Sequence, residues 1–249
     1  VVAACWEFII PKVGADIANI AALSFPKIVN KVFSRYLLQS EFFEDFLSHI
    51  HEAIFEEIDA ICNSIHNIWF VPSPFMNVLM GRDISKGGKY NNFGIHGSGL
   101  STAVDSLAAI QKLVYQDHTV SKKKYLDAVN SNFQEDGELL ATLRYEMPKM
   151  GRDSKETEDL AIQLLSWFAD ALEGRHNERG GIYRAGTGSA MYYLWHPREI
   201  GASPDGRRQG ESFGANLSPS LFAKVSGPFS VINSFSKLPY ERAINGGPL

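Results

Sequence analysis

The sequence has few cysteines, no excess of charge of one sign and no long apolar run. Cys5 and Cys62 are the two cysteines among 249 residues, which argues against a disulfide framework and favours a reducing compartment. The formal net charge of −4, with both signs interspersed, gives no reason to expect a nucleic acid or an anionic membrane as partner. Residues 63–81 form the longest charge-free stretch and contain two prolines, so we expect no membrane span. No signal-like segment opens the chain, and we expect a cytoplasmic protein.

The composition is that of a globular chain, and its patterning is typical of an α/β fold. Hydrophobic residues make up 45% and charged residues 21% of the sequence, enough to build a substantial core. Apolar residues at helical spacing predict helices over residues 41–66, 101–114, 121–133, 137–146 and 154–173. Short apolar runs predict strands over residues 68–71, 182–184 and 191–195. Without a repeat or a linker, residues 1–249 are expected to form one domain.

Three further segments have less regular patterns. Residues 17–38 carry apolar residues at helical spacing, although Pro26 should break or restart the helix. Residues 81–99 are rich in Gly, Asn and Lys and predict a loop. Residues 202–227 are punctuated by Gly and Pro, and a loop of this length is usually functional, often wrapping around an active site.

The first residues place a lone cysteine two positions before a lone carboxylate in an apolar run. Apolar surroundings raise the pKa of the Cys5 thiol and of the Glu7 carboxyl group, so both groups would be held protonated. A neutral thiol suits hydrogen-atom transfer, and Glu7 could move a proton at the same carbon because residues i and i+2 of an extended segment share a side. On residue types alone, the simpler interpretation is a buried strand in which Cys5 is a small hydrophobe.

Three familiar motifs are incomplete. His51-Glu52 begins like the helix of a zinc protease, but Phe55 stands where the second histidine is needed. Gly97-Ser98-Gly99 lacks the third glycine of the dinucleotide fingerprint, and no clear strand is predicted before it. A G-x-S-x-G elbow does not occur, so a serine hydrolase has no support.

Five short motifs follow one another along the chain. They are Ala4-Cys5-Trp6-Glu7, G-R-D-I-S-K-G-G-K-Y-N at 81–91, A-V-D-S-L-A-A-I at 103–110, Pro204-Asp205-Gly206-Arg207, and Asn245-Gly246-Gly247. In this order they resemble the motifs of the glycyl radical enzymes, the pyruvate formate-lyase-like superfamily. Each motif alone would be weak, but five in the family's order are specific.

The resemblance implies a ten-stranded α/β barrel, built from two five-stranded halves around a finger loop with Cys5 at its tip. This chain would supply the finger loop and the second half, whereas the first half and the C-terminal glycyl radical loop would lie outside it. Residues 224–229 look like the glycyl loop. However, they precede Asn245, and Pro228 replaces its aromatic residue, so we expect a turn before a helix at 230–236.

The resemblance also implies the chemistry and the site. A radical on the missing glycine takes the hydrogen atom of Cys5, the thiyl abstracts a hydrogen atom from the substrate, and Glu7 acts as general base. Asn19, near the place where a dehydratase has a carboxylate, and Tyr183 are the expected substrate-binding residues. Tyr183 can equally be a core aromatic of its strand.

The expected partners follow from the same resemblance. They are a small-molecule substrate and a separate activating enzyme that uses S-adenosylmethionine and an iron–sulfur cluster to install the radical. The chain itself is expected to bind no metal or organic cofactor, to give Cys62 no role, to be inactive alone, and to form a homodimer at full length.

The Cys-x-Glu pattern is similar to the eliminating branch of the family, which includes glycerol and diol dehydratases and other lyases. One alternative is a formate acetyltransferase type (a 2-ketoacid formate-lyase), although that enzyme has two adjacent cysteines and Cys5 is flanked by Ala4 and Trp6. A second alternative is an arylacetate decarboxylase. Two readings from other classes also stay open: a non-catalytic barrel fragment, and a Cys5 thiolate nucleophile paired with a histidine.

Overall fold

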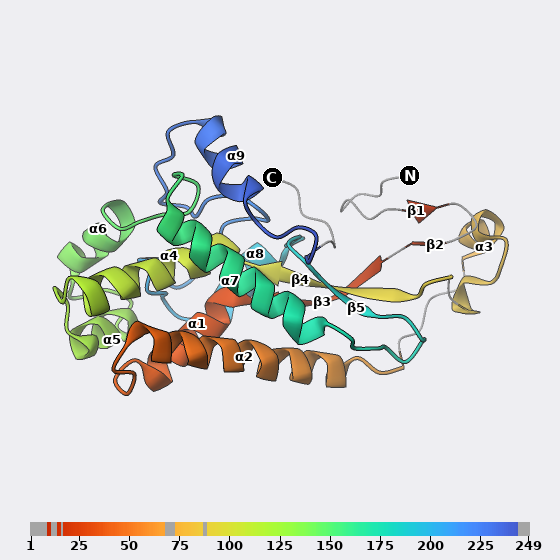
Figure 1. Cartoon of the computed structure of the whole chain (residues 1–249), viewed down its shortest axis with the longest axis horizontal. Helices are drawn as coiled ribbons and strands as arrows, with labels where there is room; N and C mark the ends of the chain where they lie inside the picture. The colour runs from red at the N-terminus through yellow and green to blue at the C-terminus, as the bar shows by residue number, and fades with distance from the viewer. Residues whose placement is uncertain (1–8, 11–13, 16, 68–72, 87–88, 244–249) are drawn as a thin grey trace.

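The computed structural model describes residues 9–10, 14–15, 17–67, 73–86 and 89–243, which form a small parallel sheet covered by helices (Figure 1). The sheet has the strand order β3-β4-β5. Its strands span Ile17–Ser24 (β3), Asn92–Ser98 (β4) and Tyr183–Gly186 (β5), and both pairs are parallel. Before it, β1 (Ile9–Ile10) and β2 (Gly14–Ala15) pair antiparallel. The described chain therefore has the α/β character that its patterning predicts.

The prediction of one interrupted helix over residues 17–38 is wrong for the first half of that segment. Residues Ile17–Ser24 form β3, and the helix α1 begins at Phe25 and ends at Tyr36. The Ser24 hydroxyl accepts a hydrogen bond from the Lys27 N–H and caps this helix, while Pro26 occupies its first turn, where no N–H is needed. Pro26 therefore starts the helix. An apolar run buried against a neighbouring strand cannot be distinguished from a helix by periodicity.

The long helix α2 spans Phe43–Ser64 and confirms the prediction over 41–66. Phe46, Ile50, Ile54 and Ile58 recur every four residues and are fully buried, so this stripe faces the core. A short helix, α3 (Pro74–Met80), and a 3-10 turn, η1 (Ile84–Lys86), follow. The strand expected over 68–71 lies outside the described residues.

The loop predicted over 81–99 is wrong in its second half, because Asn92–Ser98 is the central strand of the sheet. Glycine weakens a strand in general, which is why the pattern pointed to a loop. Here Gly97 is needed for packing, since a Cβ atom built on it would lie 2.6 Å from the Phe25 ring and 3.2 Å from Phe168. Gly97, which made the segment look like a loop, is thus the residue that allows Phe25 and Phe168 to pack against the strand.

The helix α4 (Leu100–Ile110) lies at the centre of the helical layer, and all of its residues are buried. It continues as a π-helical turn, η2 (Gln111–Gln116), followed by α5 (Lys122–Asn130), α6 (Gly137–Tyr145) and α7 (Lys155–Leu172). These elements confirm the helices predicted over 101–173. The helices α1, α2, α4 and α7 contact one another and cover the sheet on one side (Figure 1).

The last part of the chain contains one error of the sequence interpretation. Residues predicted as a strand over 191–195 form the short helix α8 (Tyr192–Trp195), continued by the turn η3 (His196–Arg198). Aromatic residues favour strands on average, but this run has no neighbouring strand to pair with among the described residues and closes as a turn instead. The final helix, α9 (Pro228–Ser236), follows Gly227 as expected. None of the described helices combines the length and apolar character that a membrane span requires.

Candidate functional site

The two faces of the parallel sheet differ in chemistry. On β4, Phe93 and Ile95 point toward the helices and are buried, and Gly97 lies on the same side against Phe25. The alternate residues Asn92, His96 and Ser98 therefore point to the other side, and they are buried as well. Buried parallel strands are normally apolar on both faces, so polar side chains on a central strand need a reason other than stability.

Strand register adds residues of the neighbouring strands to this side of the sheet. Asn19 of β3 and Arg184 of β5 both pair with Gly94 of β4, so the three positions lie in one row. We call the side that carries Asn19, Asn92, His96, Ser98 and Arg184 the polar face. Gly94 has no side chain, which leaves space between Asn19 and Arg184.

Tyr183 lies on the opposite side of the sheet from Asn19. It pairs with Phe93, and the two rings meet edge to face with centroids 6.1 Å apart. Tyr183 also borders a cavity of about 350 Å³ on the side of α7, together with Leu172. Burial raises the pKa of its hydroxyl. The structure therefore does not bring the two expected substrate-binding residues together, and it places Tyr183 where a core aromatic belongs.

Cys5 and Glu7 lie outside the described residues, so their expected roles remain predictions. The chain that follows them enters β3, the strand that carries Asn19 on the polar face. Cys62, the other cysteine, is partly buried on α2, and burial raises the pKa of its thiol. Within the described part of the chain, His, Cys, Asp and Glu do not gather in any group that could hold a metal ion.

A histidine and a serine meet at the carboxyl end of β4, a contact that sequence analysis did not predict. The Ser98 hydroxyl lies 2.8 Å from Nδ1 of His196 and also donates to the Leu23 carbonyl at 3.2 Å. The Tyr192 ring stacks obliquely over His196 at 4.9 Å. Burial lowers the pKa of His196, which favours the neutral imidazole at pH 7. Sites in parallel α/β sheets form at this end of the strands, so recognising β4 would have pointed to Ser98.

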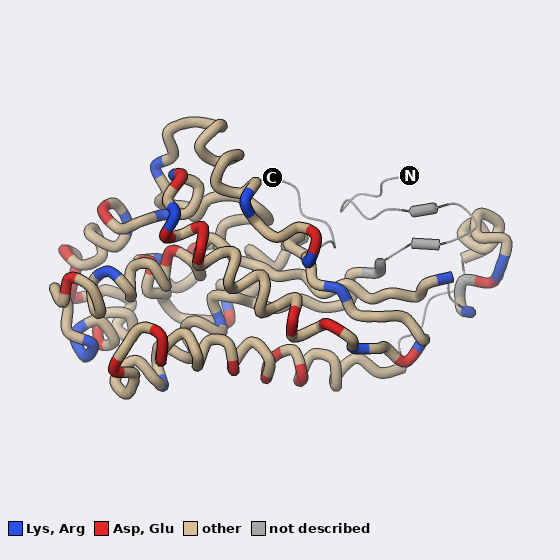
Figure 2. The backbone as a smooth tube through the Cα atoms, viewed as in Figure 1, with Lys and Arg blue, Asp and Glu red and all other residues tan. Residues whose placement is uncertain are grey.

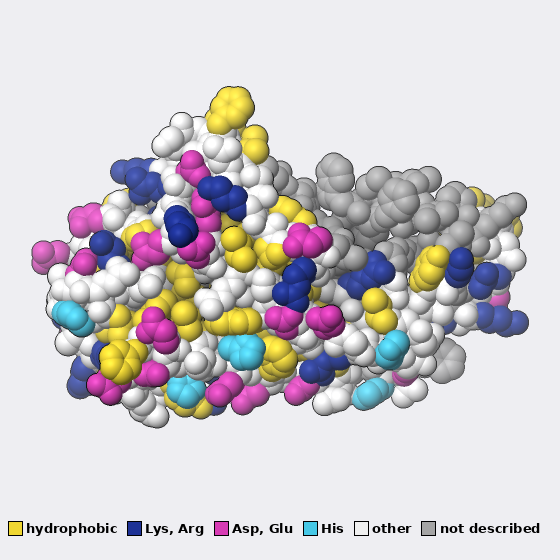
Figure 3. All heavy atoms as spheres, in the orientation of Figure 1, with side chains coloured by type: hydrophobic (Ala, Val, Ile, Leu, Met, Phe, Trp, Pro, Cys, Tyr) yellow, Lys and Arg dark blue, Asp and Glu magenta, His cyan; other side chains and the backbone are white. Residues whose placement is uncertain are grey.

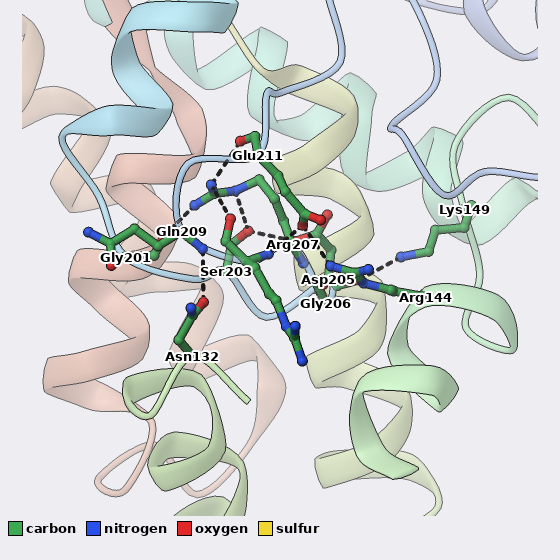
Figure 4. Close-up of polar contacts among 11 residues, drawn as sticks. Asn132, Arg144, Lys149, Gly201, Ser203, Asp205, Gly206, Arg207, Gln209 and Glu211 are labelled. Carbon is green, nitrogen blue, oxygen red and sulfur yellow. Dashed lines mark hydrogen bonds and ion pairs between the residues drawn. The ribbon is translucent and has the colours of Figure 1, made fainter. Parts of the chain in front are cut away.

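The P-D-G-R turn is a buried, hydrogen-bonded clamp at the start of the long loop (Figure 4). Asp205 accepts hydrogen bonds from the Ser203 hydroxyl at 2.6 Å and from the Arg207 backbone. The Arg207 guanidinium donates to Ser203 Oγ and to the carbonyls of Arg208, Glu211 and Gly201. These contacts fix the loop that follows η3 and engage four of the five N–H groups of the Arg207 guanidinium.

A buried ion pair joins the clamp to α4. Lys149 donates to the Asp205 carbonyl at 3.0 Å, and its ammonium lies 3.9 Å from the Asp105 carboxylate. Asp105 also accepts from the Met150 N–H at 2.7 Å and from the Ser220 hydroxyl. Burial raises the pKa of Asp105 to about 6, and Lys149 and the two hydrogen bonds oppose that shift. The long loop is thus anchored to the middle of the helical layer.

Comparison with known sequences identifies relatives. A family model described as pyruvate formate lyase-like matches residues 29–195. The chain is 28% identical over 218 residues to the trans-4-hydroxy-L-proline dehydratase of Clostridioides difficile, covering 84% of this chain and 27% of that protein. It is 26% identical over 221 residues to the (2S)-3-sulfopropanediol dehydratase of Klebsiella oxytoca, with 82% and 27% covered. The chain spans about a quarter of the length of these relatives.

Solved structures show the same fold over nearly the whole chain. The glycerol-bound B12-independent glycerol dehydratase of Clostridium butyricum matches with a TM-score of 0.82 and 25% identity, covering 91% of this chain and 32% of that one. A glycyl radical enzyme from Archaeoglobus fulgidus matches with a TM-score of 0.80 and 26% identity, covering 92% and 32%. These matches confirm the expected fold, which is part of a glycyl radical enzyme α/β barrel. The chain belongs to the pyruvate formate lyase-like family, the glycyl radical enzymes.

Proposed function

We propose that this chain is the part of a glycyl radical dehydratase that contributes the catalytic cysteine, the general base and one wall of the substrate site. The observation that supports this proposal is the polar face, to which β3 contributes Asn19; β3 begins at Ile17, after the Cys5–Glu7 segment and the β1–β2 pair. The two sequence relatives reported above are both named as dehydratases, which favours elimination of water. Buried hydroxyl, imidazole and amide groups suit a substrate that carries hydroxyl groups.

The proposed steps use residues of this chain. A glycyl radical, installed by a separate activating enzyme with S-adenosylmethionine and an iron–sulfur cluster, supplies the capacity for hydrogen-atom transfer. Cys5, once a thiyl, removes the hydrogen atom from a carbon that bears a hydroxyl group. Glu7 accepts the proton of that hydroxyl and returns it to the hydroxyl on the next carbon, which leaves as water. The product radical recovers a hydrogen atom from Cys5.

The surroundings must keep water and oxygen away from these radicals. The polar face is shielded from solvent around β4, where Asn92, His96 and Ser98 are at most 7% exposed. Asn19 and His96 would orient substrate hydroxyl groups, a role for which amide and imidazole groups are suited. The homodimer and the absence of a resident metal or organic cofactor remain part of this proposal.

The first test is made on the full-length protein, activated without oxygen by its cognate activating enzyme. We expect an organic radical signal in electron paramagnetic resonance and turnover of one member of a panel of diols, glycerol, choline, hydroxyproline, isethionate and arylacetates. Cys5→Ala and Glu7→Gln should each abolish turnover and leave the radical signal intact, because the radical is stored elsewhere. Substantial turnover by the Cys5→Ala protein would overturn the mechanism.

The same assay separates the alternatives. Conversion of pyruvate and coenzyme A, with no activity on the panel, would make the protein a formate acetyltransferase type. Turnover of arylacetates alone would favour the decarboxylase. A protein that takes up no radical after activation would support the non-catalytic fragment.

A further inference from the structure

A groove of about 360 Å³ lies between α2 and α7, on the solvent side of the helical layer. The two helices contact each other, and one face of each supplies the walls of what we call the α2–α7 groove. These walls include Glu44, Leu47, His51 and Glu52 of α2 and Gln163 and Trp167 of α7. The polar face lies on the other side of the sheet, so the groove is not part of the proposed substrate site.

An aromatic ring forms the wall on α7. Trp167 is partly exposed, and its ring meets the His51 ring edge to face, with the two centroids 5.1 Å apart. The His51 ring also contacts Phe55 at 4.7 Å, and Leu47 packs against the core. These contacts hold the indole in place while part of it stays open to the groove. Tryptophan is enriched among the residues that anchor protein interfaces, because it buries a large area and loses little side-chain entropy.

The charged residues of α2 are all acidic. The helix has six acidic residues and neither lysine nor arginine among its 22 residues, and Figure 2 shows the acidic positions spaced along it. In the second half of the helix, basic residues of neighbouring elements neutralise the carboxylates. The ion pairs there are Glu56 with Lys31, Glu57 with Lys27, and Asp59 with Arg175.

The two carboxylates of the groove have no such partners. Glu44 and Glu52 are exposed, and neither forms an ion pair with a lysine or an arginine of the described chain. Nδ1 of His49 lies 3.4 Å from one oxygen of Glu52, which leaves the other oxygen accessible. Within the described lining of the groove, His51 is the one basic side chain. The groove therefore presents accessible negative charge beside an aromatic ring.

A guanidinium group has the chemistry that this combination selects. Its planar fork donates hydrogen bonds to carboxylates and its flat face stacks on an indole, whereas an ammonium group is a compact and strongly hydrated charge. Because Glu44 and Glu52 are exposed, the groove cannot enclose a small free ligand as most small-molecule sites do. An arginine side chain of a larger partner fits better, since the body of the partner covers the open side.

We propose that the α2–α7 groove is a docking site for a partner protein that presents an arginine next to an apolar side chain. The guanidinium group lies on Trp167 between the carboxylates of Glu44 and Glu52, and the apolar neighbour covers Leu47. Opposite charges across the contact speed the encounter and set its orientation. Binding at this groove needs neither Cys5 nor a radical, so it is tested apart from the proposed function.

The fluorescence anisotropy of a short peptide tests the site on the full-length protein. The probe is acetyl-Leu-Arg-Leu-amide with an uncharged fluorophore, and the comparison peptide carries citrulline, a neutral isostere, in place of arginine. We expect saturable binding of the arginine peptide that weakens as salt is raised. The citrulline peptide should bind about tenfold more weakly or worse, because it loses the charge-assisted hydrogen bonds.

Variants of the groove give the second part of the test. Glu44→Gln/Glu52→Gln should weaken binding of the arginine peptide about tenfold or more, and Trp167→Leu should weaken it by a similar factor. Glu56→Gln is the matched control, because it removes a carboxylate of the same helix outside the groove, and binding should stay within about twofold. Circular dichroism checks that each variant is folded, and the two exposed glutamates can be replaced without disturbing the core.

Three results would overturn the proposal: no saturable binding of the arginine peptide, equal binding of the citrulline peptide, or wild-type affinity of the Glu44→Gln/Glu52→Gln protein. Arginine amide that competes as well as the peptide would make the occupant a small cation instead of a protein segment. An oligomer of the full-length protein that dissociates in Glu44→Gln/Glu52→Gln would make the occupant a second copy of the chain. Either outcome would exclude the separate partner protein proposed for this groove.

Discussion

Single residues of the sheet owe their roles to strand register. Asn19 and Tyr183 were both expected to line the substrate site, but Asn19 shares a row with Gly94, whereas Tyr183 shares the next row with Phe93. Neighbouring rows of a strand face opposite sides. Sequence analysis could not assign the side on which either residue lies, because the register of β3 and β5 depends on a strand, β4, that was predicted as loop.

Register leads to a paired prediction for turnover. Asn19→Ala in the activated full-length protein should lower kcat/KM about tenfold or more, since it removes a polar group from the polar face. Tyr183→Phe should leave kcat/KM within about twofold, because its ring faces α7 and only the hydroxyl is lost. Steady-state kinetics on the substrate found in the panel provide the measurement. A larger loss for Tyr183→Phe than for Asn19→Ala would show that the polar face is not the substrate wall.

Gly97 carries a prediction for stability. In Gly97→Ala the new methyl group would lie 2.6 Å from the Phe25 ring, which is itself fully buried and packed edge to face on Phe168. We expect the free energy of unfolding to fall by about 1–3 kcal/mol, the usual cost of overpacking. Urea unfolding of the full-length protein measures it. Gly137→Ala is the matched control, because a Cβ atom there meets nothing within 4 Å and helix α6 should gain slightly. Equal stability of the two variants would contradict the close approach.

Whole elements were predicted well where packing follows from local periodicity. The helices α2, α5, α6 and α7 have apolar stripes or caps that specify them without knowledge of their neighbours. The errors fall on elements defined by distant partners. Strand β4 is held between β3 and β5, which are far from it in the chain, and α8 takes its shape from having no strand to pair with among the described residues.

The link between α4 and the long loop leads to a prediction on pH. The pKa of Asp105 is raised from its ordinary 3.8 to about 6 in the folded protein, so the folded state holds a proton that the unfolded state has lost. The contribution of Asp105 to the free energy of unfolding is therefore fully present below pH 3.8 and is lost as pH rises through 6. Relative to Asp105→Asn, which cannot titrate, wild-type stability should fall between pH 4 and pH 7 by on the order of 3 kcal/mol.

Urea unfolding of the two proteins at several pH values measures this difference. As pH rises from 4 to 7, the stability of the wild type should fall by this amount relative to that of Asp105→Asn. Asp159→Asn is the control, because it removes an exposed carboxylate that forms a 4.0 Å pair with Lys155, and its difference in stability from the wild type should stay nearly constant over the same range. A gap that stays constant from pH 4 to pH 7 would mean that Asp105 is ionised throughout.

At the scale of the molecule, the five motifs were informative because their order along the chain is specific to one family, whereas composition indicates only that the chain is globular. The family model covers two of the motif segments, and the structural matches extend over most of the chain. The same scale explains what sequence missed: the Ser98–His196 contact joins residues 98 positions apart. No local pattern connects such residues, and only the folded sheet brings them together.

The described sheet also predicts how the 249-residue chain behaves when expressed alone. Strands β3 and β5 are its outer strands, and each has one edge with no pairing strand among the described residues. Exposed apolar side chains provide further surface for association: Phe75 is 85%, Val78 80% and Phe229 80% exposed. Figure 3 shows hydrophobic side chains at the tip of α9. Open edges and apolar patches promote association. We therefore expect residues 1–249 alone to form aggregates in size-exclusion chromatography and to enhance the fluorescence of a hydrophobic dye.

The full-length protein is the comparison for that experiment, and we expect it to elute as a defined species with weak dye fluorescence. Phe75→Ser/Val78→Ser/Phe229→Ser in the 249-residue chain should reduce dye binding without abolishing aggregation, because the strand edges are unchanged by these substitutions. A chain of 249 residues that elutes as a monomer would contradict the prediction. Its sheet edges would then have to be protected by residues of the chain itself, and half of a barrel could fold as an independent unit.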